Sequence, residues 1–123
     1  MPVMNRRNFV AVTVTLAVAN TVYSLWDLIN AIIQAESAGD VTTQASGVVR
    51  TLTLQAHPGV DGVGGNSKDV LVGDALVSTS RIGFVLSTGQ SYSDRASIQN
   101  VNVQGIYLLS AGTNQKVNVF IQA

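Results

Sequence analysis

The sequence predicts a mainly β protein, an antiparallel β-sandwich of jelly-roll-like type with one α-helix near the N-terminus. Apolar and polar residues alternate in short runs through most of the chain, as they do in half-buried strands. Turn residues separate these runs about every 8–12 residues, which is typical of sandwiches and barrels. A single segment, residues 24–37, has apolar residues at helical spacing instead. The 123 residues are too few for two cores, so we expect one domain over residues 9–123, preceded by an N-terminal arm, residues 1–8.

The apolar run after the arm is expected to be the first strand. Two arginines precede it and residues 17–19 (Ala-Val-Ala) end it, which is also the layout of a secretory signal, even a twin-arginine one. A signal has no reason to keep a period of two, whereas a half-buried strand does. This run keeps that period, with its larger apolar residues at Val10, Val12, Val14, Leu16 and Val18. It is also shorter than the roughly 20 apolar residues that span a bilayer.

Residues 24–37 change to the spacing of one helical face. The apolar stripe consists of Leu25, Leu28, Ile29 and Ile32, widened by Trp26 and Ile33. Ser24 is the predicted N-cap, Asp27 supplies an acid in the first turn, and Gly39 supplies the stop. A lone helix of this length is marginal in water, so the stripe must dock on the β core. Residues 38–47 form a polar connector.

From residue 48 onward the pattern predicts β-structure. The expected strands are residues 48–56, 69–72, 81–86, 105–110 and 116–122, with a short strand at 76–77 and an extended polar edge at 91–96. Proline cannot donate to a strand ladder, so His57, Pro58 and Gly59 end the first of these strands. Residues 59–68 form a glycine-rich loop, and turns are expected at 73–74, 87–90 and 111–114.

Composition excludes several classes of protein. Seven Lys and Arg balance seven Asp and Glu, so the chain lacks the basic surplus that a nucleic-acid binder uses to neutralise phosphates. It has no cysteine, which excludes disulfide scaffolds and thiolate metal sites. Charged residues make up 11% of the chain, against about 25% in a typical globular protein, and hydrophobic residues make up 46%. We expect so weakly charged a chain to bury part of its surface against another protein.

No catalytic, cofactor or metal site is predicted. The only histidine, His57, lies at a turn and lacks a recognisable nucleophile or orienting partner. The acids Asp61, Asp69, Asp74 and Asp94 all fall in loops or near turns, where Asp bonds to its local backbone. The glycine-rich loop has no Gly-Lys-Ser/Thr and opens no helix, so it is not a phosphate loop. Asp61, Asn66 and Asp69 offer oxygens, but not at the spacing of a calcium-binding loop.

Four segments resemble a group of small structural proteins from the virions of tailed bacteriophages. They are residues 49–56 (VRTLTLQA), 69–74 (DVLVGD), 83–91 (GFVLSTGQS) and 106–117 (IYLLSAGTNQKV). The similarity spans residues 48–123 and consists of short strand and turn motifs. The sequence departs from the group where Ser87-Thr88-Gly89 replaces a usual Ala-Pro-Gly, and in the loop at 59–68. The resemblance implies a virion structural protein, and a capsid decoration or cement protein that binds shell subunits is the first expectation.

Two other functions remain open, namely a neck or tail component of the virion and a secreted ligand-binding sandwich such as a small lectin. The expected partners are the major capsid protein or other virion proteins and further copies of this chain, with a trimer favoured and no nucleic acid or membrane. The expected location is the virion, assembled in the host cytoplasm. Two adjacent arginines in the arm suit carboxylates on a partner. The predicted interface residues are Arg6, Arg7, Phe9, His57, Asp61, Asn66 and Lys68.

Overall fold

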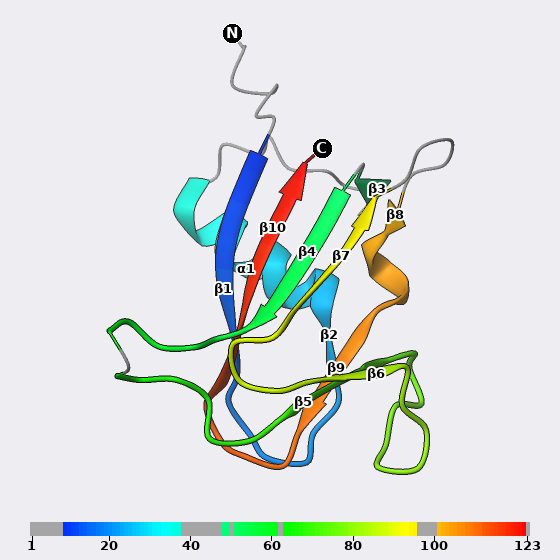
Figure 1. The fold of residues 1–123 in the computed structure, drawn as a ribbon. Coiled ribbons are helices and arrows are strands. Elements are labelled where there is room, and N and C mark those ends of the chain that lie inside the picture. The colour runs from blue at the N-terminus through cyan, green and yellow to red at the C-terminus, as the bar shows by residue number, and fades with distance from the viewer. Residues whose placement is uncertain (1–8, 38–47, 50, 62, 96–100, 123) are drawn as a thin grey trace, which may run out of the picture.

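The computed structural model describes residues 9–37, 48–49, 51–61, 63–95 and 101–122, and they form the predicted mainly β fold (Figure 1). In chain order the described elements are β1 (Phe9–Leu16), β2 (Tyr23–Ser24), α1 (Leu25–Ser37), β3 (Val48–Val49), β4 (Thr51–Ala56), β5 (Val70–Gly73), β6 (Phe84–Leu86), β7 (Ser91–Arg95), β8 (Val101–Asn102), the 3₁₀ helix η2 (Val103–Gly105), β9 (Tyr107–Ser110) and β10 (Gln115–Gln122).

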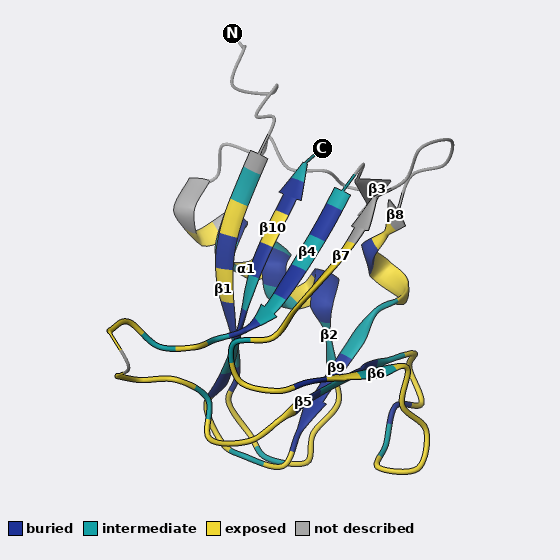
Figure 2. Cartoon of the chain, viewed as in Figure 1, coloured by how far each residue is buried: buried dark blue, intermediate teal, exposed yellow. Residues whose placement is uncertain are grey.

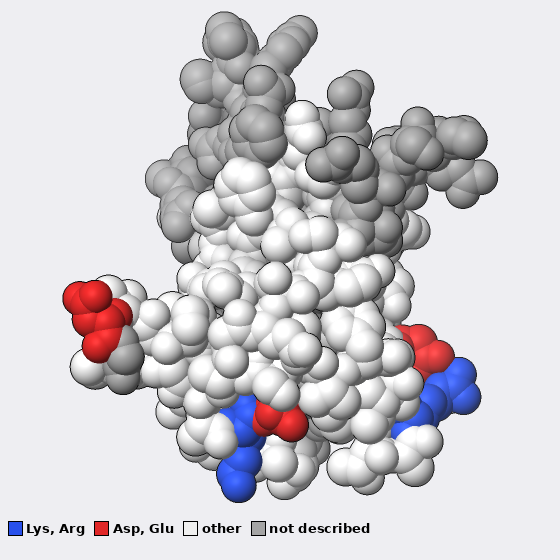
Figure 3. Space-filling model, viewed as in Figure 1, with Lys and Arg blue, Asp and Glu red and all other residues white. Residues whose placement is uncertain are grey.

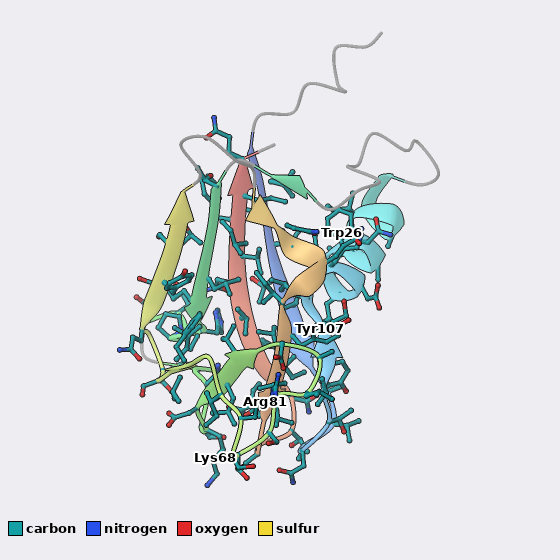
Figure 4. All side chains as sticks on the ribbon, turned by 90° about the vertical axis from the view of Figure 1, so that its right-hand side faces the viewer. Trp26, Lys68, Arg81 and Tyr107 are labelled. Atoms are coloured by element: carbon teal, nitrogen blue, oxygen red, sulfur yellow. The ribbon has the colours of Figure 1, made fainter. Side chains whose placement is uncertain are left out.

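The strands build two antiparallel four-stranded sheets. The first sheet has the order β1-β10-β4-β7 and the second sheet the order β2-β9-β5-β6, while β3 and β8 form a separate two-stranded ladder. One face of the first sheet is covered by α1, and no described helix or strand covers its other face (Figures 1 and 4). The rings of Phe84 on β6 and Tyr92 on β7 lie 4.4 Å apart between centroids, so the two sheets also meet at these edge strands. The arrangement is sandwich-like, with the core between the sheets and under the helix.

The two faces of the first sheet differ as its alternation predicts. Every second residue is buried in β4, in β10 and from Val12 onward in β1, and the residues between them are half-buried or exposed, so the strands are banded in Figure 2. The buried apolar set is Val12, Val14, Leu16, Leu52, Leu54, Ala56, Val117, Val119 and Ile121, and Gln115 at the start of β10 is buried as well. The register places this set on one face, because Val12 lies opposite Val119 and Val119 lies opposite Leu54. The prediction for the first strand holds to Leu16, where β1 ends. Val18 is therefore exposed and outside the pattern.

The helix docks as expected. Leu25 and Ile29 are fully buried, whereas Leu28 and Ile32 are half-buried and pack against the core. Trp26 and Ile33 widen the buried stripe, as the sequence predicts. The Ser24 Oγ accepts a hydrogen bond from the backbone N–H of Asp27 at 3.4 Å, which is the predicted N-cap. The expected stop at Gly39 and the connector at 38–47 lie outside the described residues.

Several predicted boundaries are wrong. The strand expected over residues 48–56 is two strands, because β3 pairs with β8 while β4 pairs with β10 and β7. Residues 76–77 are not a strand, since the Val77 N–H donates to Asp74 O in a turn. The strand expected from residue 81 begins at Phe84, after an isolated bridge between Ser78 and Arg81.

Three short elements were not predicted, namely η2 and the two-residue strands β2 and β8. The strand expected from residue 105 begins at Tyr107, because the Ile106 N–H closes η2 on Val103 O at 3.1 Å. The polar edge is confirmed over residues 91–95, which form the edge strand β7.

Candidate functional site

The glycine-rich loop is held at its base by one asparagine side chain. Asn66 Nδ2 donates to Lys116 O at 2.7 Å, and Asn66 Oδ1 accepts from Lys116 N at 2.7 Å. The Asn66 backbone N–H donates to His57 O at 2.9 Å, and the His57 N–H donates to Lys116 O at 3.1 Å. The amide side chain therefore continues the β4–β10 ladder beyond the point where Pro58 ends it.

A second, buried side chain holds the other limb of the loop. Gln115, only 5% exposed, accepts through Oε1 from the backbone N–H groups of Ser67 and Lys68 at 2.8 and 2.9 Å. Its Nε2 donates to Thr113 O at 2.9 Å. The next residue of the limb, Asp69, accepts through its carbonyl from the Ser110 hydroxyl at 2.8 Å. Two limbs fixed in this way present the tip of the loop in a defined position.

The tip itself carries two exposed valines. Val60 and Val63 exchange a pair of backbone hydrogen bonds of 2.9 and 3.0 Å, which closes the tip. Their side chains are 71% and 75% exposed. Asp61 between them has a φ of 55°, in the left-handed region that Asp tolerates better than most residues. These two backbone bonds leave both valine side chains facing solvent.

The loop over residues 74–83 likewise combines a bonded base with exposed apolar side chains. Arg81 forms a two-pronged ion pair with Asp74, in which Nη2 lies 2.7 Å from Oδ2 and Nε lies 3.1 Å from Oδ1. Hydrogen bonds from Arg81 and from the Leu76 N–H hold the pKa of the Asp74 carboxyl below its ordinary value, and Asp74 in turn raises the pKa of Arg81. Leu76, on the same loop, is 67% exposed, and Ile82 is exposed as well.

We call the exposed apolar side chains of these two loops and of residues 17–22 the loop-end surface. It consists of Val18, Val22, Val60, Val63, Leu76 and Ile82. The three loops lie in the lower half of Figure 1, away from both ends of the chain. Charged side chains also gather in that half of the face seen in Figure 3. Apolar tips surrounded by charged and polar groups are the usual anatomy of a protein–protein contact.

The open face of the first sheet carries a different arrangement, a hydrogen-bonded row that we call the amide row. The Thr13 hydroxyl donates to Asn118 Oδ1 at 2.9 Å, and Asn118 Nδ2 donates to Gln55 Oε1 at 3.0 Å. His57 Nδ1 lies 3.1 Å from the same Asn118 Oδ1. A groove of about 630 Å³ crosses this face over the row, and Phe120, 46% exposed, forms part of its lining. The middle of this face shows no charged side chain among the described residues (Figure 3).

The predicted interface residues fall at two ends of the molecule. Asp61, Asn66 and Lys68 belong to the glycine-rich loop, and His57 lies at its base, where its carbonyl accepts from the Asn66 N–H. Asp61 and Lys68 are exposed, and His57 and Asn66 are half-buried. Phe9 begins β1 at the opposite end, opposite Gln122 of β10 (Figure 1). Arg6 and Arg7 lie outside the described residues. The fold thus brings four of the seven together and leaves Phe9 apart from them.

Sequence reasoning missed the exposed apolar tips and the amide row. The signal for the tips was present, because Val60 and Val63 are apolar residues between glycines in an otherwise polar loop. The amide row gives no such signal, since Thr13, Gln55 and Asn118 are far apart in the sequence. Asn66, which the sequence assigns to the interface, has a structural role in the fold, because both polar atoms of its side chain bond to the backbone of Lys116.

No group of three or more His, Asp or Glu side chains is close enough to hold a metal ion within the part of the chain that the structure describes. No helix of that part is long and apolar enough to cross a bilayer. Comparison of the sequence with models of known protein families gave no match, and comparison with curated proteins gave none either.

Proposed function

We propose that this chain is a non-enzymatic structural protein of a tailed-phage virion, a capsid decoration protein that binds shell subunits through the loop-end surface. The observation that carries the proposal is the exposure of Val60, Val63 and Leu76 on loops whose bases are fixed. Apolar side chains gain free energy when a partner removes them from water. Loops that are already ordered lose little conformational entropy on docking.

The resemblance to phage virion proteins supports the same surface. The segments that carry it include residues 69–74 and 106–117, which contain the groups that hold the loops. Ser110 and Gln115 anchor the glycine-rich loop, and Asp74 anchors the loop over residues 74–83. The resembling motifs are therefore the framework of the loop-end surface.

In this proposal the partners are the major capsid protein and further copies of the chain, with a trimer favoured, and the location is the virion assembled in the host cytoplasm. The arm, residues 1–8, precedes Phe9 at the other end of the molecule, so we assign it a separate contact, in which Arg6 and Arg7 bind carboxylates of a further copy of the chain. The described core lies within residues 9–122, so deleting the arm is expected to leave a folded domain that binds its partners more weakly.

A neck or tail component of the same virion is the second candidate, and the number of copies separates the two. Quantitative mass spectrometry of purified virions is expected to find on the order of hundreds of copies per particle for a decoration protein, whereas a closed neck ring holds about six or twelve. A count in the lower range would replace the decoration proposal with the neck proposal.

The docking surface is tested by binding the purified protein to heads that lack it. Val63→Asp and Leu76→Asp each place a charge on the proposed contact, and we expect at least about tenfold weaker binding for each, because an unpaired charge resists desolvation. Ala31→Asp, on an exposed position of α1 remote from the loops, is the matched control and should bind like the unmodified chain. Full decoration by both loop variants would exclude this surface as the contact.

A further inference from the structure

The amide row keeps hydrogen-bonding capacity after its own bonds are made. Each side-chain amide nitrogen carries two N–H groups. One N–H of Asn118 is used on Gln55, and one N–H of Gln55 is used on Gly89 O at 3.4 Å. The Thr13 hydroxyl gives its hydrogen to Asn118, so its oxygen lone pairs remain. The row therefore offers donors and acceptors side by side at the floor of the groove.

The row is also held in place before any ligand arrives. Its members come from three neighbouring strands, with Thr13 opposite Asn118 and Asn118 opposite Gln55 in the sheet register. The cross-strand bonds select one rotamer for each side chain, and His57 adds a contact to Asn118 from the end of the row. A ligand that binds here pays little for ordering these side chains.

We propose that this groove binds a neutral saccharide. Sugar hydroxyls both donate and accept hydrogen bonds, which matches a row of amide N–H groups and hydroxyl oxygens. Phe120 lies two residues after Asn118 on β10, and its side chain is 46% exposed. The C–H face of a sugar ring can pack against the exposed part of this apolar ring. The groove volume of about 630 Å³ lies within the range of about 300–1,000 Å³ usual for small-ligand sites.

The described side chains that line the groove indicate which kind of ligand it favours. The described residues that line it are Ala11, Val12, Thr13, Ile32, Thr53, Gln55, Ser91, Asn118, Val119 and Phe120. None of these described side chains carries a charge, so together they favour a neutral ligand over an anionic or cationic one. The site is separate from the loop-end surface, and its occupation does not depend on the proposed docking to a shell.

The test is a nuclear magnetic resonance titration of the full chain with neutral hexasaccharides of glucose, mannose, galactose and N-acetylglucosamine, each to about 10 mM, which detects binding in the millimolar range. We expect at least one of them to shift the side-chain amide signals of Asn118 and Gln55. Phe120→Ala and Asn118→Ala should each weaken that sugar's binding at least about tenfold. Gln122→Ala, on the same strand but outside the groove lining, is the matched control and should leave it unchanged.

Several results would overturn the proposal. One is the absence of any signal shift with every sugar tested. Another is a loss of sugar binding in the Gln122→Ala control as large as in Phe120→Ala and Asn118→Ala. A third is a shift produced only by an anionic sugar such as sialyllactose. Broadening of the same signals with rising protein concentration, without sugar, would assign the face to contacts between copies instead. Val63→Asp, which alters the loop-end surface, should not affect the titration, so failure of one proposal is distinguishable from failure of the other.

Discussion

The side-chain amide of Asn66 occupies the place of a β-strand residue beside Lys116. Both of its polar atoms bond to the Lys116 backbone at 2.7 Å, one as donor and one as acceptor. A backbone residue in an antiparallel pair makes the same two bonds to its partner. The ladder of the first sheet is thereby extended by one side chain after the chain itself has turned away at Pro58.

Asn66→Ala is expected to lower the free energy of unfolding by about 1–3 kcal/mol, because it leaves the Lys116 N–H without its acceptor in a half-buried position. Urea denaturation measures the loss. Asn30→Ala is the control, since the side chain of this half-buried asparagine of α1 makes no hydrogen bond among the residues that the structure describes. An unfolding free energy of Asn66→Ala within about 0.5 kcal/mol of wild type would show that the two hydrogen bonds from the Asn66 side chain to Lys116 contribute nothing to stability.

Gln115→Leu is expected to loosen the glycine-rich loop without unfolding the sheet. The substitution keeps most of the side-chain volume but removes the oxygen that accepts from Ser67 and Lys68. Hydrogen exchange at these two amides should accelerate at least about tenfold, while the amide of Val70 in β5 keeps its protection. Gln115→Glu keeps an accepting oxygen for Ser67 and Lys68 but loses the donor to Thr113 O, so exchange at Ser67 and Lys68 should be slower than in Gln115→Leu. Exchange in the Glu variant as fast as in the Leu variant would contradict this explanation.

The loss of stability on truncating a side chain of α1 should increase with how deeply that side chain is buried. Ile29→Ala is expected to cost about 2–5 kcal/mol, because Ile29 is fully buried and the site is left with a cavity. Leu28→Ala should cost clearly less, since Leu28 is half-buried at the border of the core. Chemical denaturation of both variants gives the order directly. The reverse order would mean that α1 is rotated relative to the sheet in solution.

The Asp74–Arg81 pair should make the loop over residues 74–83 sensitive to acid. The folded-state pKa of Asp74 is lowered, chiefly by the hydrogen bond from Arg81. A depressed carboxyl pKa stabilises the fold above the ordinary Asp value of 3.8, and this contribution is lost as the pH falls through the folded-state pKa. Following the Asp74 carboxyl carbon by nuclear magnetic resonance from about pH 6 to pH 2 should place its midpoint below the ordinary value.

Arg81→Gln is the control for that titration, and the Asp74 midpoint should move up toward the ordinary value in it. Concentrated salt should have a similar but smaller effect, because both side chains are more than half exposed and salt screens exposed charges. An unchanged midpoint in Arg81→Gln would assign the shift to the Leu76 N–H instead.

Local patterns in the sequence were sufficient to predict which face of the first sheet is buried and where the helix lies. The alternation along β10 and the helical spacing around Ile29 each repeat several times, so a single core face satisfies them. The change of partner between β3 and β4 had no such signal, because a strand that passes from one partner to another keeps its alternation. The turn at Val77 was misassigned for a related reason, since one buried valine in a loop resembles a short strand.

The two candidate sites were predictable to different degrees. Loop residues such as Asp61 and Lys68 were singled out because their neighbours are turn-forming residues close in the sequence. The amide row depends on register, since a shift of one residue in β10 would turn Asn118 into the core. That register is fixed by the burial of Val117 and Val119 over the whole sheet, which no single segment of the sequence specifies.

The pairing of the first and last described strands also determines how the fold responds to force. Phe9 and Gln122 are opposite each other at one end of the β1–β10 ladder. Tension applied at these two residues would act along the hydrogen bonds, which run perpendicular to antiparallel strands, and would open them one after another like a zipper. The fold is therefore mechanically weak when pulled by its ends. A load that enters through the loops and acts along the strands would instead have to shear the whole ladder at once.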